Sequence, residues 1–555
     1  MRPAAPHRPT VPSLRRRTFL ELTGTAALGV GALQLPGAAG CARSAPTDEP
    51  GTATAFAHGV ASGDPLQDRV VLWTRVSPTA PAADPVEVAW WIARAPDGRS
   101  PVHSGRVRTD ASRDYTVKVD AAGLEPGTTY FYGFTSGTTD SPVGRTRTLR
   151  VEGPERLRLA VVSCANRPQG YHTVYRAIAR RDDLDAVIHL GDYIYEYADG
   201  VYGDGRELGR AIEPPHEIVS LADYRLRYAS YRVDPDLQAV HRQHPMIAVW
   251  DDHESANDAW QDGAQNHQPG KGEGAWPARR SAAVRAYHEW LPIRESDAAA
   301  PLRTYRAFRF GELADLLMLD TRLVGRDEQA ARGDLEAMRA PGRQLLGRAQ
   351  EAWLFDRLAD SQADGVAWRL LGQQVVMGQL ALPGTAGNPD AWDGYPAARD
   401  RLLAHLEQAG IEDVVVLSGD VHSSWAMDLA RDPYDPARYD SASGRGSLAV
   451  EMVTPAVSSS PLSSFGRVAQ LYAHATDDRP HLRFVDLEHR GYLLLEITRE
   501  SARGEWYFAE DVTRPDGDVR LGLAWQTAAG AAHLVPGEPR VPGEPRVPRE
   551  PGDAD

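Results

Sequence analysis

Lysine is nearly absent from this chain of 555 residues, and no stretch of the sequence gathers positive charge. Lys118 and Lys271 are the only lysines among 61 basic residues, and the formal net charge is −15. A nucleic-acid partner requires a basic face or stripe, so we expect no such partner. The acidic balance is compatible with carboxylates whose charge is cancelled by bound cations.

Long apolar runs and cysteines are also scarce. After the N-terminal region, no segment has the length and purity of a membrane span, which predicts a chain without a transmembrane anchor. The two cysteines are Cys41 and Cys164. In an exported protein a disulfide is the simplest expectation, but it fails if Cys41 is lipidated, cleaved away or held on a flexible linker. Cys164 would then be a lone thiol that needs another explanation.

The N-terminal segment differs in composition from the rest of the chain. In "LRRRTFLEL", Arg16 and Arg17 precede Thr18, and a small-residue apolar run continues to Gly40. Residues 1–40 resemble a twin-arginine export signal, which implies the twin-arginine machinery as a partner and a secreted or cell-envelope location. A basic tail beside a hydrophobic helix is the alternative. The following "GAAGC" offers a cleavage point, or a lipid anchor at Cys41, although Ala38 stands where lipidation signals usually have leucine.

The composition divides the remaining chain into four parts. Residues 41–55 are a polar linker. Residues 56–150 consist of short alternating runs separated by turn residues, which predicts an all-β sandwich domain. In that domain "LEPGTTYFY" resembles the tyrosine corner of immunoglobulin-like or fibronectin-type modules. Residues 151–534 alternate apolar strands with helices of 3.6-residue period, which predicts an α/β layered domain. Residues 535–555 form a Pro-rich tail that we expect to be disordered.

Four predicted strands of the α/β domain end in polar clusters. The apolar runs "LAVVSCAN", "VIHLGD", "IAVWDDHE" and "VVVLSGDVH" are followed by possible ligands: Cys164; Asp192 with Tyr193 and Tyr195; Asp251, Asp252, His253, Glu254 and Asn257; and Asp420 with His422. One such aspartate is more often a helix cap, and one such histidine a structural group. Because ligands bind at the carboxyl ends of strands in α/β sheets, four ends together favour a shared metal site.

The ligand types suggest two kinds of metal ion. Thiolate, tyrosinate and imidazole suit a trivalent or late first-row metal, whereas carboxylate and amide oxygens suit calcium or magnesium. Asp192 is the candidate for a carboxylate that bridges two ions, which would offset the cost of burying its charge. A zinc or manganese site with the same ligands is the alternative.

The motifs "SCAN", "GDYIYEY", "WDDHE" and "GDVHSSW" resemble those of the PhoD family of alkaline phosphatases and phosphodiesterases, within the metallophosphoesterase superfamily. The resemblance runs from about Phe56 to about Glu510, and it implies an Fe³⁺/Ca²⁺ centre. It assigns to iron the residues Cys164, Asp192, Tyr195 and His422. It assigns to calcium Asp192, Asn257 and Asp420, with Asp252 close by. The wider superfamily has an Asp-x-His pair where this chain has Ser163-Cys164.

Two further residues are candidates for catalysis. Metal ions would activate a water molecule to attack phosphorus. His253 would then protonate or hydrogen-bond an ester oxygen, with a structural pairing to Asp252 as the alternative. Arg322, in "MLDTR", could grip phosphate with two hydrogen bonds, or could instead pair with Asp320 or a helix carboxylate.

The sequence therefore predicts an exported, metal-dependent phosphoric ester hydrolase of the alkaline phosphatase type. A phosphodiesterase or phospholipase-D-like hydrolase of lipid or wall polymer is the alternative among enzymes. A calcium-dependent wall-binding protein with an inactive phosphatase fold is the alternative from another class.

Overall fold

The structure, a computed structural model, describes residues 56–78, 85–295, 300–466, 470, 472 and 475–538. The predicted export signal, the linker with Cys41, and the tail beyond residue 538 lie outside the described residues. Val535 and Pro536, which open the predicted tail, pair with a neighbouring strand, so the ordered chain continues past the expected boundary. Within the described ranges, no helix combines the length and apolarity that crossing a membrane requires.

Two large mixed sheets form the body of the described chain. The first has ten strands in the order β22 (Val535–Pro536), β21 (Val519–Ala528), β20 (Ser501–Ala509), β19 (Gly491–Thr498), β9 (Arg156–Val162), β10 (Ala186–His189), β11 (Pro245–Ala248), β1 (Val60–Gly63), β2 (Arg69–Arg75) and β5 (Thr116–Ala122). The second has seven, in the order β12 (Arg306–Phe310), β13 (Ala314–Met318), β14 (Trp368–Gly372), β15 (Val414–Ser418), β17 (Ser447–Val453), β16 (Ser424–Ala430) and β18 (Leu482–Asp486).

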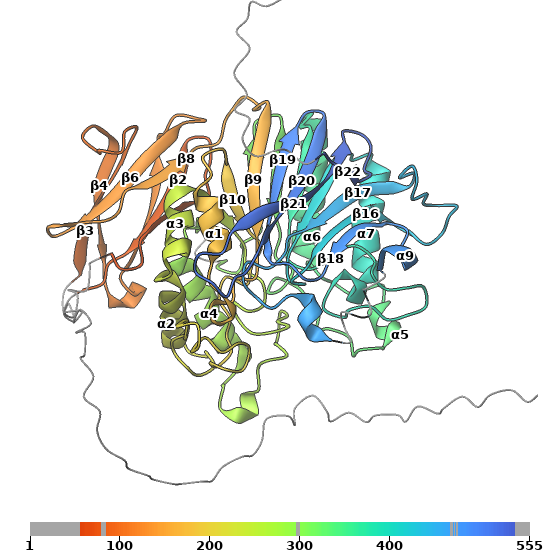
Figure 1. The fold of residues 1–555 in the computed structure, drawn as a ribbon, viewed down its shortest axis with the longest axis horizontal. Coiled ribbons are helices and arrows are strands. Elements are labelled where there is room, and N and C mark those ends of the chain that lie inside the picture. Colours follow the sequence, from red (N-terminus) through yellow and green to blue (C-terminus); the bar gives the residue numbers. More distant parts are fainter. Residues whose placement is uncertain are drawn as a thin grey trace, which may run out of the picture. The chain divides into compact units, whose positions relative to one another are not determined.

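The two sheets pack face to face, and each carries helices on its outer face. Alternate residues along the central strands explain this arrangement: Leu159 and Val161 of β9 join the core between the sheets, whereas Ala160 and Val162 face the helices. The first sheet is covered by α1 (Thr173–Ala179), α2 (Leu221–Arg232), α3 (Pro235–Gln243) and α4 (Trp276–Trp290). These helices are drawn in yellow to green in Figure 1. Strands buried on both faces are mostly apolar, as in other layered α/β folds.

The second sheet is covered by α6 (Arg348–Ala363) and α7 (Pro396–Ala409). Leu354 and Leu358 of α6 pack with Leu402 and Leu406 of α7 against the outward side chains of β14 and β15. Two short helices, α5 (Leu335–Met338) and α9 (Ala475–Asp478), lie in connecting segments. The predicted α/β layered architecture is therefore confirmed.

The N-terminal region is joined to this body through the first sheet. Strand β1 pairs in parallel with β11, and β2 and β5 extend the same sheet to its edge. A third sheet holds β3 (Val86–Ala93), β4 (Pro101–Thr109), β6 (Thr129–Ser136), β7 (Thr139–Asp140) and β8 (Gly144–Arg147). It shares an apolar core with β2 and β5, and these two strands belong to the first sheet, which also holds strands from beyond residue 150. The all-β sandwich domain expected for residues 56–150 stays a prediction.

Two local features bear on the sequence-based predictions for this region. The backbone N–H of Glu125 donates to the hydroxyl of Tyr130 over 2.9 Å, which is the contact that a tyrosine corner makes. Trp73 of β2 is fully buried, and its Nε1 donates to the carbonyl of Glu289 in α4 over 2.8 Å. The N-terminal strands thus contribute side chains to the core of the helical layer.

Candidate metal centre

The carboxyl ends of parallel strands from both sheets meet at one place. Strands β9, β10 and β11 run parallel in the first sheet, and β13, β14, β15 and β17 run parallel in the second. Ser163, directly after β9, forms an isolated parallel bridge with Ala456, which follows β17. The backbone carbonyl of Cys164 accepts from the N–H of Ser459 over 3.2 Å. These contacts join the two sheets where the predicted ligands leave their strands.

Four predicted ligands have an unusual backbone conformation. Cys164, Asp192, Asp420 and His422 have φ angles of 61°, 57°, 63° and 52°. A left-handed conformation costs a residue other than glycine about 1–3 kcal/mol, and it persists where surrounding structure imposes it. Gly191, at φ 107°, brings its backbone so close to Asp251 that an added Cβ would lie 2.3 Å from the Asp251 backbone nitrogen. The backbone is therefore bent to aim these side chains inward.

The first group of donors, which we call the thiol cluster, consists of Cys164, Asp192, Tyr195 and His422. Ligand atoms of Cys164, Asp192 and His422 lie within 4.8 Å of one another. The hydroxyl of Tyr195 donates to Asp192 Oδ2 over 3.0 Å and lies 3.3 Å from His422 Nε2. The structure therefore brings together all four residues that the resemblance assigns to iron.

Burial sets the protonation of the thiol cluster when no cation is present. It raises the pKa of the Cys164 thiol, the Tyr195 hydroxyl and the Asp192 carboxyl well above their ordinary values, and the neighbouring carboxylates add to this effect. It lowers the pKa of His422 to about 4, which keeps that imidazole neutral. Asp192 Oδ1 is buried and has no hydrogen-bond partner in the described part of the chain. A cation would satisfy that oxygen and would favour the ionised thiolate and phenolate.

The second group, which we call the carboxylate cluster, gathers five aspartates around one another. Oxygens of Asp251, Asp252 and Asp420 lie within 4.8 Å of one another, and so do oxygens of Asp252, Asp258 and Asp390. Burial and the charge of Asp390 and Asp252 raise the pKa of Asp258 to about 8. Burial and neighbouring carboxylates raise the pKa of Asp420 to about 7, although Arg322 opposes them. Oxygen donors at this density suit calcium or magnesium.

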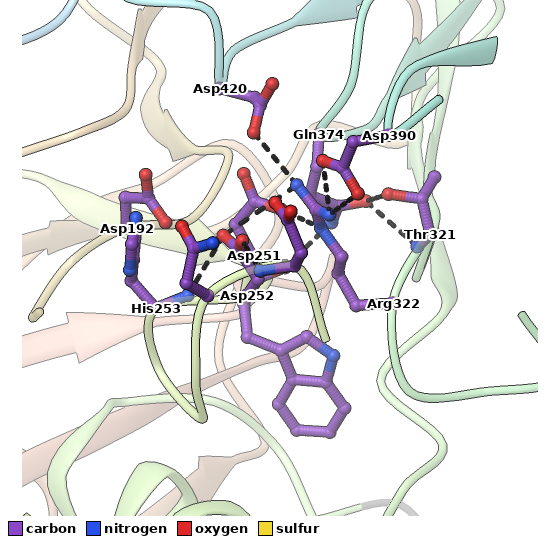
Figure 2. Close-up of polar contacts among 12 residues, drawn as sticks. Asp192, Asp251, Asp252, His253, Thr321, Arg322, Gln374, Asp390 and Asp420 are labelled. Atoms are coloured by element: carbon purple, nitrogen blue, oxygen red, sulfur yellow. Dashed lines mark hydrogen bonds and ion pairs between the residues drawn. The ribbon is translucent and has the colours of Figure 1, made fainter. Parts of the chain in front are cut away.

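Arg322 lies inside the carboxylate cluster and is fully buried (Figure 2). Its Nη1 donates to both oxygens of Asp390 at 2.8 and 2.7 Å, its Nη2 to Asp420 Oδ1 at 2.8 Å, and its Nε to Asp251. Asp320, named earlier as an alternative partner, instead accepts from the Arg322 backbone N–H over 2.7 Å. The predicted contact of Arg322 with phosphate stays a prediction, because it requires one of the three carboxylate pairs to open.

His253 lies next to both clusters. One of its nitrogens lies within 4.8 Å of carboxylate oxygens of Asp192 and Asp252, while Nδ1 is 2.7 Å from Glu196 Oε2. Burial would lower the pKa of His253, but the carboxylates of Asp192, Asp252 and Glu196 outweigh it and raise the pKa well above the ordinary value. The alternative expectation, a pairing with the Asp252 side chain, is replaced by a pairing with Glu196.

Asn257, predicted as a calcium ligand, has its side-chain amide turned to another partner. Its Nδ2 donates to Gln265 Oε1 over 3.1 Å, and its backbone N–H donates to Glu196 Oε1 over 2.8 Å. Its role as a ligand stays a prediction.

Sequence reasoning gave several residues of the site no role. Glu254 accepts the backbone N–H groups of Asp192 and Asp251 at 3.1 and 2.8 Å, and so links two strand ends. Glu196 accepts from three donors, and these outweigh its burial and lower its pKa to about 2. Glu196 lies in the motif "YIYEY" and Glu254 in the motif "WDDHE", and these motifs are the signal that could have identified them. Asp390 follows the weakly patterned segment "TAGNP", which carried no signal.

The donors present fit metal ions. Six aspartates, Asp192, Asp251, Asp252, Asp258, Asp390 and Asp420, face two buried guanidinium groups, those of Arg322 and Arg326. Buried oxygens of Asp192 and Asp251 lack hydrogen-bond partners in the described ranges. So much buried negative charge is stable only when paired, protonated or coordinated to cations.

A centre of this kind, placed where two face-to-face sheets end, is suited to a metal-dependent hydrolase. Comparisons with known proteins agree. Residues 159–506 match the family model of the PhoD-like phosphatases, and residues 40–150 match the model of their N-terminal domain. The chain belongs to the PhoD-like phosphatase family, whose members are metal-dependent phosphoric ester hydrolases.

Two relatives support this assignment over most of the length of the chain. The chain is 36% identical to alkaline phosphatase D of Bacillus subtilis (strain 168) over 490 residues, which are 84% of this chain and 79% of the relative. It is also similar to a solved structure of PhoD, with a TM-score of 0.79 and 32% identity, covering 89% of this chain and 94% of that one. The predicted family and the predicted phosphoric ester hydrolysis are confirmed.

Metal-free protein should become less stable as the pH rises from about 4 to about 7. Asp420 has a pKa of about 7 when folded and 3.8 as a free group, so the folded state holds the extra proton in this window, and raising the pH favours unfolding. Urea unfolding after chelation should give a lower free energy of unfolding at about pH 8 than at about pH 5. Added calcium should reverse the loss at high pH, and Asp420→Asn should flatten the slope. Greater stability of the chelated protein at the higher pH would contradict this account.

Proposed function

We propose that this chain hydrolyses phosphate monoesters with Fe³⁺ held by the thiol cluster and Ca²⁺ held beside it by oxygens that include those of Asp252 and Asp420. The observation that carries the proposal is the position of Asp192. Its carboxylate belongs both to the group with Cys164 and His422 and to the group with Asp252 and His253, and its Oδ1 is buried without a hydrogen-bond partner. A carboxylate in that position is suited to two cations at once.

The residues divide by role as follows. Iron would be held by Cys164, Asp192, Tyr195 and His422. Calcium would be held by Asp192, Asp252, Asn257 and Asp420. When bound, such cations supply Lewis-acid charge to a phosphoryl oxygen and lower the pKa of water.

His253 and Arg322 would act without binding metal. His253 would give a proton to the oxygen of the leaving group as the phosphorus–oxygen bond breaks. Arg322 would hold Asp251, Asp390 and Asp420 in place, because its guanidinium donates to all three. A contact between Arg322 and substrate would need Asp420, the most exposed of the three carboxylates at 20%, to release it.

The N-terminal region would be a structural module of the immunoglobulin or fibronectin type. The bond between Glu125 and Tyr130, and the core shared between its two sheets, support this proposal. We assign no chemistry to it.

Initial rates on paired 4-nitrophenyl phosphate mono- and diesters test the activity. The wild type should turn over the monoester faster, and chelation should stop it. Asp192→Ala should lose about 10³-fold or more, because metal ions contribute several kcal/mol to transition-state stabilisation. Asp516→Ala, in which a side chain 69% exposed is removed, is the matched control and should keep wild-type rates. Faster diester turnover would favour the phosphodiesterase alternative, and no turnover by folded, metal-loaded protein would contradict the proposal.

The colour of the purified protein tests the identity of the first metal. A phenolate bound to Fe³⁺ absorbs visible light by charge transfer, so the wild type should be coloured and Tyr195→Phe should lose the phenolate absorption band. Tyr193→Phe is the control, because the Tyr193 hydroxyl contacts His241 at 2.9 Å and is not a donor of the thiol cluster. Colourless, active protein that contains zinc or manganese instead of iron would show the assignment to be wrong.

Export by the twin-arginine route, with a secreted or cell-envelope location, is supported by the sequence of residues 1–40. Replacing both Arg16 and Arg17 with lysine should retain phosphatase activity inside the cell, because that pathway depends on the arginine pair. Arg15→Lys alone is the control. Cell fractionation with an activity assay measures the outcome, and unchanged export of the double variant would argue for another route. The same fractions, analysed for a lipid on Cys41, decide whether the protein is anchored.

A further inference from the structure

The imidazole of His253 is held from several sides by one short segment of chain. Its ring lies 4.2 Å from the ring of Tyr195 and 5.4 Å from that of Tyr197, measured between centroids. Tyr202 stacks at 6.3 Å with an interplanar angle of 19°. Glu196, which lies between Tyr195 and Tyr197 in the sequence, accepts a hydrogen bond from Nδ1 of the ring. The orientation of His253 is thus set by residues 195–202.

Glu196 is itself fixed through both carboxylate oxygens. Its side chain is fully buried, and Oε2 accepts from His253 Nδ1 at 2.7 Å. Oε1 accepts from the backbone N–H of Asn257 and from the side-chain amide of Asn266, each at 2.8 Å. Because a carboxylate can only accept, the hydrogen of this pair must lie on Nδ1. A carboxylate held at both ends cannot rotate away from the imidazole.

The other ring nitrogen is the one left for chemistry. In the described part of the chain no residue hydrogen-bonds to His253 Nε2, and the side chain is 10% exposed. The histidine groups with Asp192 and Asp252, which belong to the two clusters. With Nδ1 committed to Glu196, Nε2 is the nitrogen available to an ester bound beside those clusters.

We propose that Glu196 is a positioning residue that holds His253 so that Nε2 meets the leaving-group oxygen of the ester. The proposal rests on the function proposed above and assigns a role to a residue that touches neither metal nor substrate. In the step concerned, a water oxygen bonds to phosphorus and loses a proton to solvent as the ester phosphorus–oxygen bond breaks; the Nε2–H bond breaks, and an O–H bond forms on the departing alcohol. The imidazole keeps the hydrogen on Nδ1, which still donates to Glu196, and water restores the proton to Nε2.

A second buried carboxylate–imidazole pair provides a matched control. Asp428, in β16, is fully buried and accepts from His533 Nδ1 at 2.6 Å. It also accepts from the Tyr439 hydroxyl at 2.8 Å and from the Leu534 backbone N–H at 2.9 Å. The pair has the burial and the number of donors of the Glu196 site, but it belongs to neither cluster. Asp428→Asn therefore makes the same kind of chemical change without touching His253.

The leaving group of the substrate distinguishes a positioning role from a general structural one. A dinitrophenolate leaves without a proton, whereas a simple alcohol such as that of an alkyl phosphate must be protonated as it leaves. Glu196→Gln should therefore lower kcat on the alkyl ester by about 10²-fold or more, the usual contribution of general acid catalysis. It should lower kcat on the dinitrophenyl ester by less than about tenfold, with KM little changed on either ester. Asp428→Asn should affect both esters equally or not at all.

Two measurements made without substrate accompany the rates. Iron and calcium content, and the midpoint of thermal unfolding, should match the wild type in Glu196→Gln. If that variant does not fold, Asn266→Ala, which removes one donor to Glu196 at a half-buried position, should show a smaller loss that is again confined to the alkyl ester.

The outcomes separate this inference from the proposed function. Loss on the alkyl ester alone supports the positioning role. An equal loss on both esters, or no loss on either, overturns it while leaving the phosphatase assignment intact. If the wild type turns over neither ester, the proposed function fails, and the inference fails with it.

Discussion

Mutual repulsion among buried carboxylates is the constraint on which the centre of this structure depends. Six aspartates meet where two sheets end, and burial together with the charges of neighbouring carboxylates raises the pKa of Asp192 well above its ordinary value. Arg322 relieves part of the repulsion by donating to three of them. The remainder requires protons or cations, so the same charges that would destabilise an empty site make it select metal ions.

Strained backbone conformations, and hydrogen bonds from residues behind the predicted ligands, keep these carboxylates close together. Left-handed conformations at Cys164, Asp192, Asp420 and His422 turn the side chains into a space that the strands alone would not reach. Glu254 joins two strand ends through backbone N–H groups, and Glu196 orients His253. Strain at a few residues is offset by the extensive packing of two sheets and their helices, which is where functional strain is usually sustained.

The sequence predicted the donors better than it predicted their surroundings. Gly191-Asp192 and Gly419-Asp420 were found because parallel strands bring their carboxyl ends together. Helix α2 was missed because its buried face combines Tyr224, Tyr228 and Tyr231, which have helical spacing, with two arginines that break the apolar pattern. Arg227 is satisfied by backbone carbonyls, including that of Tyr197 at 3.0 Å, and only the folded chain supplies them. The pairing of β1 with β11 also could not be predicted from the sequence, because backbone hydrogen bonds do not depend on side-chain type.

The order of strands in the first sheet governs when the centre can be completed during synthesis. Strand β9, which delivers Cys164, lies between β10 and β19, and its residue Val161 is paired with Leu493. On one side, the strand that precedes Cys164 therefore pairs with a strand that is synthesised more than three hundred residues later. A pairing of such high sequence separation forms slowly. A ribosome must have nearly finished the chain before the thiol cluster is enclosed. Any metal ion that the thiol cluster binds would therefore enter a chain whose synthesis is nearly or fully complete.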